Sequence, residues 1–117
     1  MKLPNCVEAH IPESKITNYL LNAEHPKGRS KAKYFTQFGF SVAQWKQLAD
    51  ALFDHAQNHE VNKTEHTPFG IRYVIEGELS APDNRRPQVR VVWFIEKAGM
   101  QPRLVTAYPL EVEDGND

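Results

Sequence analysis

The sequence contains a single cysteine, Cys6, among its 117 residues, which excludes an internal disulfide and a cysteine-based metal site. It has no apolar run long enough to cross a bilayer, so we expect no membrane partner. Residues 1–11 have no apolar stretch after a basic start, so we expect no signal peptide and a cytoplasmic protein. Repeats and low-complexity segments are also missing. The remaining composition, 40% hydrophobic and 25% charged, is that of one ordinary globular domain.

The net charge is only −1, but the charges are unevenly distributed along the chain. Residues 111–117 carry four carboxylates and predict an acidic flexible tail. Without these four charges the net charge would be +3, so the rest of the chain is mildly basic. A basic body is compatible with an anionic partner such as RNA, although it does not require one.

The spacing of apolar residues predicts three helices in the first half of the chain, of which two are short. The first follows Pro12 and ends near Asn22, after an extended lead-in over residues 1–12. The second begins near Ser30 and is stopped by Gly39, because glycine suits the left-handed conformation that caps a helix.

The third predicted helix is the clearest. Ser41 and Gln44 have the spacing of a capping box, and an amphipathic apolar stripe follows them. His55 and His59 lie four residues apart near its end, and His66 comes soon after. An i,i+4 histidine pair can form half of a metal site. Because no further ligand lies at a known spacing, we predict no metal and no cofactor, and interpret these histidines as exposed polar residues around the helix end.

From Val61 onward the apolar period changes to two, which predicts strands. Four segments show this period, the first one weakly: 61–65, 70–79, 88–96 and 103–108. The third is apolar on both faces, as expected of a central strand. In the last, strict alternation would put Leu104, Thr106 and Tyr108 on one face. The chain therefore predicts an α+β fold over residues 13–110, with three N-terminal helices packed on one face of a three- or four-stranded antiparallel meander.

The most basic part of the chain runs from His25 to Phe35. Its four cations are Lys27, Arg29, Lys31 and Lys33. The predicted start of the second helix lies here, where free backbone N–H groups and the helix dipole favour a phosphate or a carboxylate. Gly28 would let an anion approach the backbone closely. The alternative is a solvated lysine-rich turn whose charge is offset by acids such as Glu24.

Residues able to do chemistry on RNA are also present. A ribonuclease that works without a metal needs a general base, a general acid and a group that stabilises the developing phosphorane charge. His25 can move protons near neutral pH, and the strands supply Arg72, Arg90, Thr106 and Tyr108. Such residues occur in most sheets, so their types alone do not identify a site.

Three motifs resemble the signatures of an uncharacterised bacterial family, a domain of unknown function: HPKGRSKAKYF at 25–35, TPFGIRY at 67–73 and RLVTAYP at 103–109. Members of that family occur as small stand-alone proteins and as C-terminal modules of polymorphic toxins. The resemblance covers residues 16–109. The order of helices before sheet, ending in T-x-Y-P, is also similar to the barnase–EndoU–colicin–RelE superfamily. Its members are mostly metal-independent ribonucleases, often toxins neutralised by a cognate partner.

The second resemblance implies a cleft with two walls. On chemical grounds, His25 would act as general acid or base on one wall, and Thr106 and Tyr108 would orient the reacting groups on the other. The implied phosphate-binding residues are Lys27, Arg29 and Lys31 beside His25, and Arg72 on the opposite wall.

Two functions follow from the sequence. The leading hypothesis is a toxin-type domain that binds or cleaves RNA, with a cognate immunity or antitoxin protein as its protein partner. The alternative is a non-enzymatic interaction module that docks an acidic partner protein through the basic turn. A net charge of −1 is low for a protein that depends on non-specific nucleic-acid affinity, and this favours the alternative.

Overall fold

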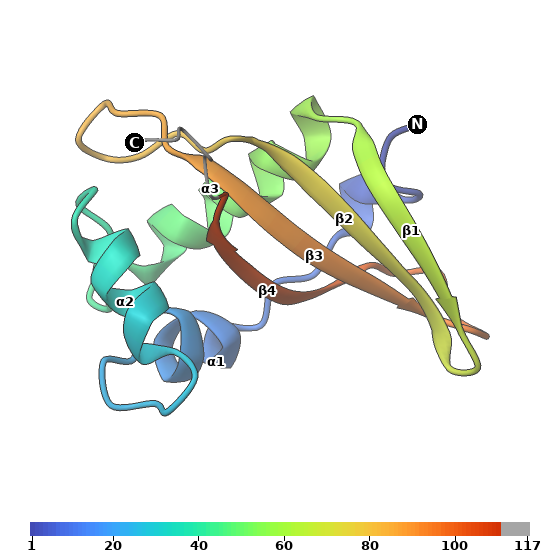
Figure 1. Cartoon of the computed structure of the whole chain (residues 1–117), viewed down its shortest axis with the longest axis horizontal. Helices are drawn as coiled ribbons and strands as arrows, with labels where there is room; N and C mark the ends of the chain where they lie inside the picture. Colours follow the sequence, from blue (N-terminus) through green and yellow to red (C-terminus); the bar gives the residue numbers. More distant parts are fainter. Residues whose placement is uncertain (111–117) are drawn as a thin grey trace, which may run out of the picture.

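Helical segments come first and strands second in the structure, a computed structural model that describes residues 1–110 (Figure 1). The helical segments are η1 (Cys6–Glu8), α1 (Glu13–Lys15), η2 (Ile16–Leu20), α2 (Arg29–Thr36) and α3 (Trp45–Asn58). The strands are β1 (Val61–Thr67), β2 (Gly70–Glu78), β3 (Gln88–Glu96) and β4 (Arg103–Pro109). α1 runs directly into η2, so the two form one helical segment, and α2 and α3 are the other two predicted helices. The order of helices before strands confirms the predicted α+β class. The predicted acidic tail lies outside the described residues.

The four strands form one antiparallel sheet in the order β1-β2-β3-β4. α3 runs behind the sheet, and α1 and α2 lie beside β4 (Figure 1). Trp93 and Ile75 face the helices and are fully buried. The prediction that residues 88–96 form a central strand is confirmed, because β3 lies between β2 and β4. Val92, on the face of β3 away from the helices, is also only 1% exposed. The face opposite α3 is called the open face below.

α3 is amphipathic for a simple reason of spacing. Its buried residues, at i, i+3, i+4, i+7 and i+8, form one stripe against the sheet: Leu48, Ala51, Leu52, His55 and Ala56. The Ser41 hydroxyl accepts a bond from the Gln44 N–H at 3.3 Å, which is half of the predicted capping box. The helix itself begins at Trp45.

The lead-in over residues 1–12 is less extended than the sequence indicates. It contains the 3₁₀ turn η1, and Leu3 packs into the core with 2% exposure. After the turn, His10 pairs in parallel with Arg103 on the outer edge of β4. Its N–H donates to Pro102 at 2.8 Å, and its carbonyl accepts from Leu104 at 3.1 Å. The lead-in therefore covers part of one sheet edge.

A β-bulge in β4 overturns the expected alternation of this strand. Thr106 pairs with Val92 and Leu104 pairs with Trp93, so Val105 has no partner on β3. The extra residue turns Leu104 toward the core, where it is 2% exposed. Thr106 and Tyr108 instead share the open face with Val92 and Arg90, their partners on β3. Leu104 does not share their face.

Gly28 fixes the loop between η2 and α2 against η2. A Cβ at this position would overlap the backbone carbonyl oxygen of Tyr19. The φ angle of Gly28 is −93°, which any residue adopts, so its requirement is one of space. Gly28 is predicted to let an anion approach the backbone, but the Tyr19 carbonyl oxygen occupies that space.

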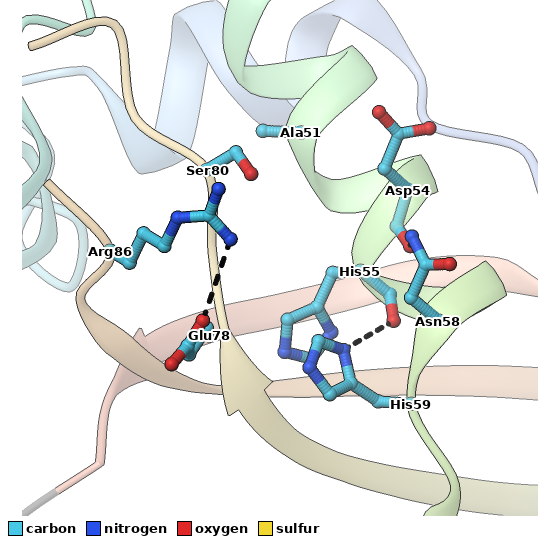
Figure 2. A pocket seen from close by; sticks show the side chains of 8 residues that line it. All are labelled: Ala51, Asp54, His55, Asn58, His59, Glu78, Ser80 and Arg86. Atoms are coloured by element: carbon cyan, nitrogen blue, oxygen red, sulfur yellow. Dashed lines mark hydrogen bonds and ion pairs between the residues drawn. The ribbon is translucent and has the colours of Figure 1, made fainter. Parts of the chain in front are cut away.

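The prediction that His55 is an exposed residue at the end of the helix is wrong. His55 is 2% exposed, and its Nε2–H donates to the Gly77 carbonyl at 3.2 Å. The His59 ring lies 4.5 Å from it between centroids, and the two form part of the wall of a pocket of about 200 Å³ between α3 and β2 (Figure 2). Burial, with a smaller contribution from His59, lowers the pKa of His55 from 6.5 to about 4.

The buried His55 predicts a loss of stability in acid. The folded protein keeps this ring neutral down to about pH 4, whereas the unfolded chain protonates it near 6.5. The stabilisation is fully present above pH 6.5 and is lost as the pH falls toward 4, by about 3 kcal/mol. Urea unfolding from pH 7.5 to 4 should therefore give a smaller loss for His55→Gln than for the wild type. The exposed control His66→Gln should lose as much as the wild type, and an equal loss in His55→Gln would contradict the assignment.

The close approach at Gly28 predicts that Gly28→Ala lowers the free energy of unfolding by about 1–3 kcal/mol, because the added methyl group must displace backbone. Gly99→Ala is the matched control, since its Cβ would meet no atom closer than 3.6 Å and should change stability by less than about 0.5 kcal/mol. Thermal or urea unfolding measures both. Equal effects of the two substitutions would refute the role of this contact.

Candidate functional site

Tyr19 joins the helices to the strand that carries the predicted catalytic residues. It lies in η2, a π-helical turn, a rare element that occurs often at functional sites. Its hydroxyl lies 2.9 Å from the Thr106 hydroxyl on β4, a hydrogen bond between residues 87 positions apart. The β4 bulge makes this contact available because it turns Thr106 away from the core. A hydroxyl pair therefore stands where α1, η2 and the open face meet.

Two lysines flank the Tyr19 ring. The Lys15 Nζ lies 5.4 Å from the ring centroid and donates to the Val105 carbonyl of the bulge at 3.1 Å. The Lys31 Nζ lies 5.5 Å from the same centroid and donates to the Lys27 carbonyl at 3.2 Å. These are cation–π distances, and both ammonium groups are held by a backbone oxygen as well. The hydroxyl pair thus lies beside two fixed positive charges.

His25 packs its ring edge-on against Tyr19, with 5.1 Å between centroids. Its Nδ1 accepts the backbone N–H groups of Lys27 and Gly28 at 2.9 and 3.0 Å. A nitrogen that accepts two bonds carries no hydrogen, so this geometry assigns the ring proton to Nε2. His25 can therefore offer a ligand an N–H donor at Nε2, and protonating Nδ1 would break both backbone bonds.

The backbone at the start of α2 differs from the expected anion site. The N–H groups of Lys27 and Gly28 bind the His25 ring, and the Arg29 N–H donates to the His25 carbonyl at 2.9 Å. These three donors are already used within the chain. The N–H groups of Lys27, Gly28 and Arg29 are therefore not available to an anion, and at these three positions attraction must come from the side chains.

The basic side chains of this region have no acidic partners among residues 1–110. Lys27 and Arg29 are exposed, and neither forms an ion pair with Glu24 or any other described carboxylate. The other five arginines of the chain all do, with N–O distances of 2.7 to 3.7 Å. Lys46 and Lys97 are also exposed without a described carboxylate partner, so the turn differs from the rest of the surface in the density of its cations and in its unpaired arginine. We name the surface made by Lys15, Lys27, Arg29, Lys31 and Lys33 the basic surface.

Tyr108 and Arg72 line a separate groove of about 350 Å³ on the open face. The Arg90 guanidinium lies 5.6 Å from the Tyr108 ring centroid, and Arg72 pairs with Glu65 at 3.6 Å. Arg72 is two strands away from β4, which is about 10 Å. Arg72 therefore lies in the groove with Tyr108, apart from the residues that surround Tyr19.

The structure thus brings His25, Lys31 and Thr106 together around Tyr19, and puts Tyr108 next to them along β4. Lys27 and Arg29 are exposed on the turn at the start of α2, and Arg72 lies apart in the groove. Sequence reasoning missed the two residues that connect the set, Tyr19 and Lys15. Tyr19 fits the apolar spacing of the first helix, so its hydroxyl gave no signal. Lys15 lies outside the basic run.

Two other kinds of site find no support in the described residues. No three of the His, Cys, Asp and Glu residues between 1 and 110 lie where they could hold a metal ion. His55 and His59 are together, but His66 lies on β1. No helix in this part of the chain combines the length and hydropathy of a membrane span.

A solved structure with a similar fold comes from a complex of a contact-dependent growth inhibition toxin and its immunity protein, from Klebsiella pneumoniae 342. The match has a TM-score of 0.69 and covers 92% of this chain and 97% of that chain. The sequences are 14% identical, so the likeness concerns the fold alone.

Sequence comparison gives a family without an assigned activity. No curated protein sequence matches the chain. A family model matches residues 2–111, almost the whole sequence. The chain therefore belongs to DUF6883, a domain of unknown function.

Proposed function

We propose that this domain binds RNA across the basic surface and cleaves it at the Tyr19–Thr106 hydroxyl pair without a metal ion. The observation that carries the proposal is that Lys15 and Lys31 lie against the Tyr19 ring, and that all five cations of the basic surface lack a carboxylate partner among residues 1–110. Uncompensated lysine and arginine side chains are the usual contacts to phosphate groups. The likeness in fold to a chain from a toxin–immunity complex is compatible with a toxin-type role.

The reaction we propose is an internal transesterification. The 2′-hydroxyl oxygen of one nucleotide attacks the adjacent phosphorus and loses its proton to water, while the bond from phosphorus to the 5′ oxygen breaks. Tyr19 donates its proton to the departing 5′ oxygen and recovers one from water. Thr106 holds the Tyr19 hydroxyl, and Lys15 and Lys31 stabilise the phosphorane charge. His25 contributes its Nε2–H as a donor to a phosphate oxygen.

A second candidate function uses the same surface. An acidic protein could dock on the unpaired cations, and the similar fold in a toxin–immunity complex supports a protein partner. The two candidates differ in what they require of the isolated domain. RNA cleavage needs the Tyr19 hydroxyl, whereas protein docking needs only the charges.

The cleavage proposal predicts that Tyr19→Phe lowers the rate of cleavage of a labelled single-stranded RNA by about 10²–10⁴-fold, because it removes the proton donor. Binding should persist, since the ring and its two lysine contacts remain. Tyr34→Phe makes the same chemical change on α2 and should cleave like the wild type. Cleavage by Tyr19→Phe at the wild-type rate would exclude this role. No binding and no cleavage by the wild type would reject the RNA function and leave the docking function.

The basic surface predicts a steep salt dependence of RNA affinity. For each phosphate contact that a substitution removes, the slope of log K against log salt should fall by about 0.7. The double variant Lys27→Gln, Arg29→Gln should show this change in fluorescence anisotropy titrations. Lys97→Gln is the control, because Lys97 lies between β3 and β4, at the end of the sheet away from α1 and α2 (Figure 1). Equal slopes for the double variant and the wild type would count against phosphate binding here.

A further inference from the structure

The groove on the open face has no role in the cleavage step, yet it has the features of a ligand site. Its volume is about 350 Å³, and every strand of the sheet contributes to it. Its lining residues are Lys63 and Glu65 on β1, Arg72, Val74 and Glu76 on β2, Arg90 and Val92 on β3, and Tyr108 on β4. No helix lies between these side chains and solvent within the described chain, because α3 covers the other face.

The floor of the groove is apolar. Val74 and Val92 are cross-strand partners and are 8% and 1% exposed, although they are on the face opposite α3. Longer polar side chains around them exclude water. The ring of Tyr108 stands at the β4 side, with the Arg90 guanidinium 5.6 Å from its centroid. Because this floor is itself almost fully covered, a flat heterocycle in the groove gains mainly from stacking on the partly exposed Tyr108 ring.

The rim carries one acceptor and one donor side by side. Arg90 donates from Nε and Nη2 to the same Glu76 oxygen, Oε2, at 2.8 and 2.7 Å. Within residues 1–110, Oε1 of Glu76 makes no such bond. This oxygen can accept from an amino group or a ring N–H, and the remaining guanidinium N–H groups can donate to a ring carbonyl. Both side chains are about one-third exposed, so a ligand can reach them.

Guanine matches this pair of groups best among the four RNA bases. It presents an amino group next to a ring N–H, which suits a carboxylate oxygen. It also presents the O6 and N7 acceptors that arginine contacts most often in nucleic acids. RNA bases are read in this way when they are unstacked, in single strands and loops.

The position of the groove relates it to the phosphate site. Thr106 and Tyr108 are alternate residues on the same face of β4, about 7 Å apart along the strand. Thr106 bonds to Tyr19 at the basic surface, and Tyr108 lines the groove. A nucleotide whose phosphate lies at Tyr19 can therefore extend its base over Tyr108 into the groove.

We propose that the groove between Glu76, Arg90 and Tyr108 binds a guanine base and gives the domain a preference for guanine in single-stranded RNA. The preference as a property of RNA recognition rests on the proposed RNA function. Binding of the base itself is a property of the groove and can be measured without cleavage.

The test is the affinity of the whole chain for GMP, AMP, CMP and UMP, measured by NMR titration or calorimetry at low salt. GMP should bind at least tenfold more tightly than the other three. Glu76→Gln should lower the affinity for GMP at least tenfold and change the affinity for the other three nucleotides by less than twofold. The reason is that it replaces an acceptor that only guanine uses fully. Glu96→Gln is the matched control, since Glu96 pairs with Arg103 outside the groove. Tyr108→Leu should weaken all four nucleotides at least fivefold through lost stacking.

Three results would overturn the proposal: equal binding of the four nucleotides, tighter binding of CMP than GMP, or no binding of any nucleotide. In each case RNA cleavage that depends on Tyr19 would still support the proposed function. Selective GMP binding that is lost in Glu76→Gln, together with intact RNA, would instead support the groove and reject the cleavage mechanism. The wild-type comparison of four nucleotides does not depend on the folding of any variant.

Discussion

The hydrogen bond between Tyr19 and Thr106 connects two parts of the chain that each depend on it for their place in the site. On one side, η2 supplies Tyr19 and supports the loop that leads to α2, since Gly28 lies directly against the Tyr19 carbonyl. On the other side, the bulge at Val105 turns Thr106 to the open face, and Lys15 holds the bulge carbonyl. Without the bulge, Thr106 would face the core and could not bond to Tyr19 on the open face.

The density of cations then distinguishes this region from the rest of the molecule. Arginines elsewhere pair with carboxylates, which neutralises the surface of the sheet locally. The lysines and the arginine of the basic surface are left without such partners among residues 1–110. Although the net charge is −1, positive charge is therefore in local excess at the basic surface. Local excess, more than net charge, determines where an anionic polymer binds.

Periodicity predicted the order and type of the elements well, because each depends on neighbours a few residues apart. The strand predicted at 88–96 has the observed bounds, the one predicted at 70–79 ends one residue late, and the helix after Ser41 begins at Trp45. The bulge at Val105 was not predictable, since the sequence alternates through it without a break. Nor was the burial of His55, because a polar ring in an apolar stripe gives no sign of its pairing with Gly77. The partner of Tyr19 is 87 residues away, beyond any local pattern.

The central claim is that RNA lies along the basic surface and the adjoining end of β4. An NMR titration of isotope-labelled protein with a short single-stranded RNA tests this directly, residue by residue. The account predicts that the largest amide shifts fall in residues 15–33 and 104–108, with few in α3 or in the turn between β1 and β2. Shifts concentrated at α3 or at that turn, or no shifts at all, would contradict it.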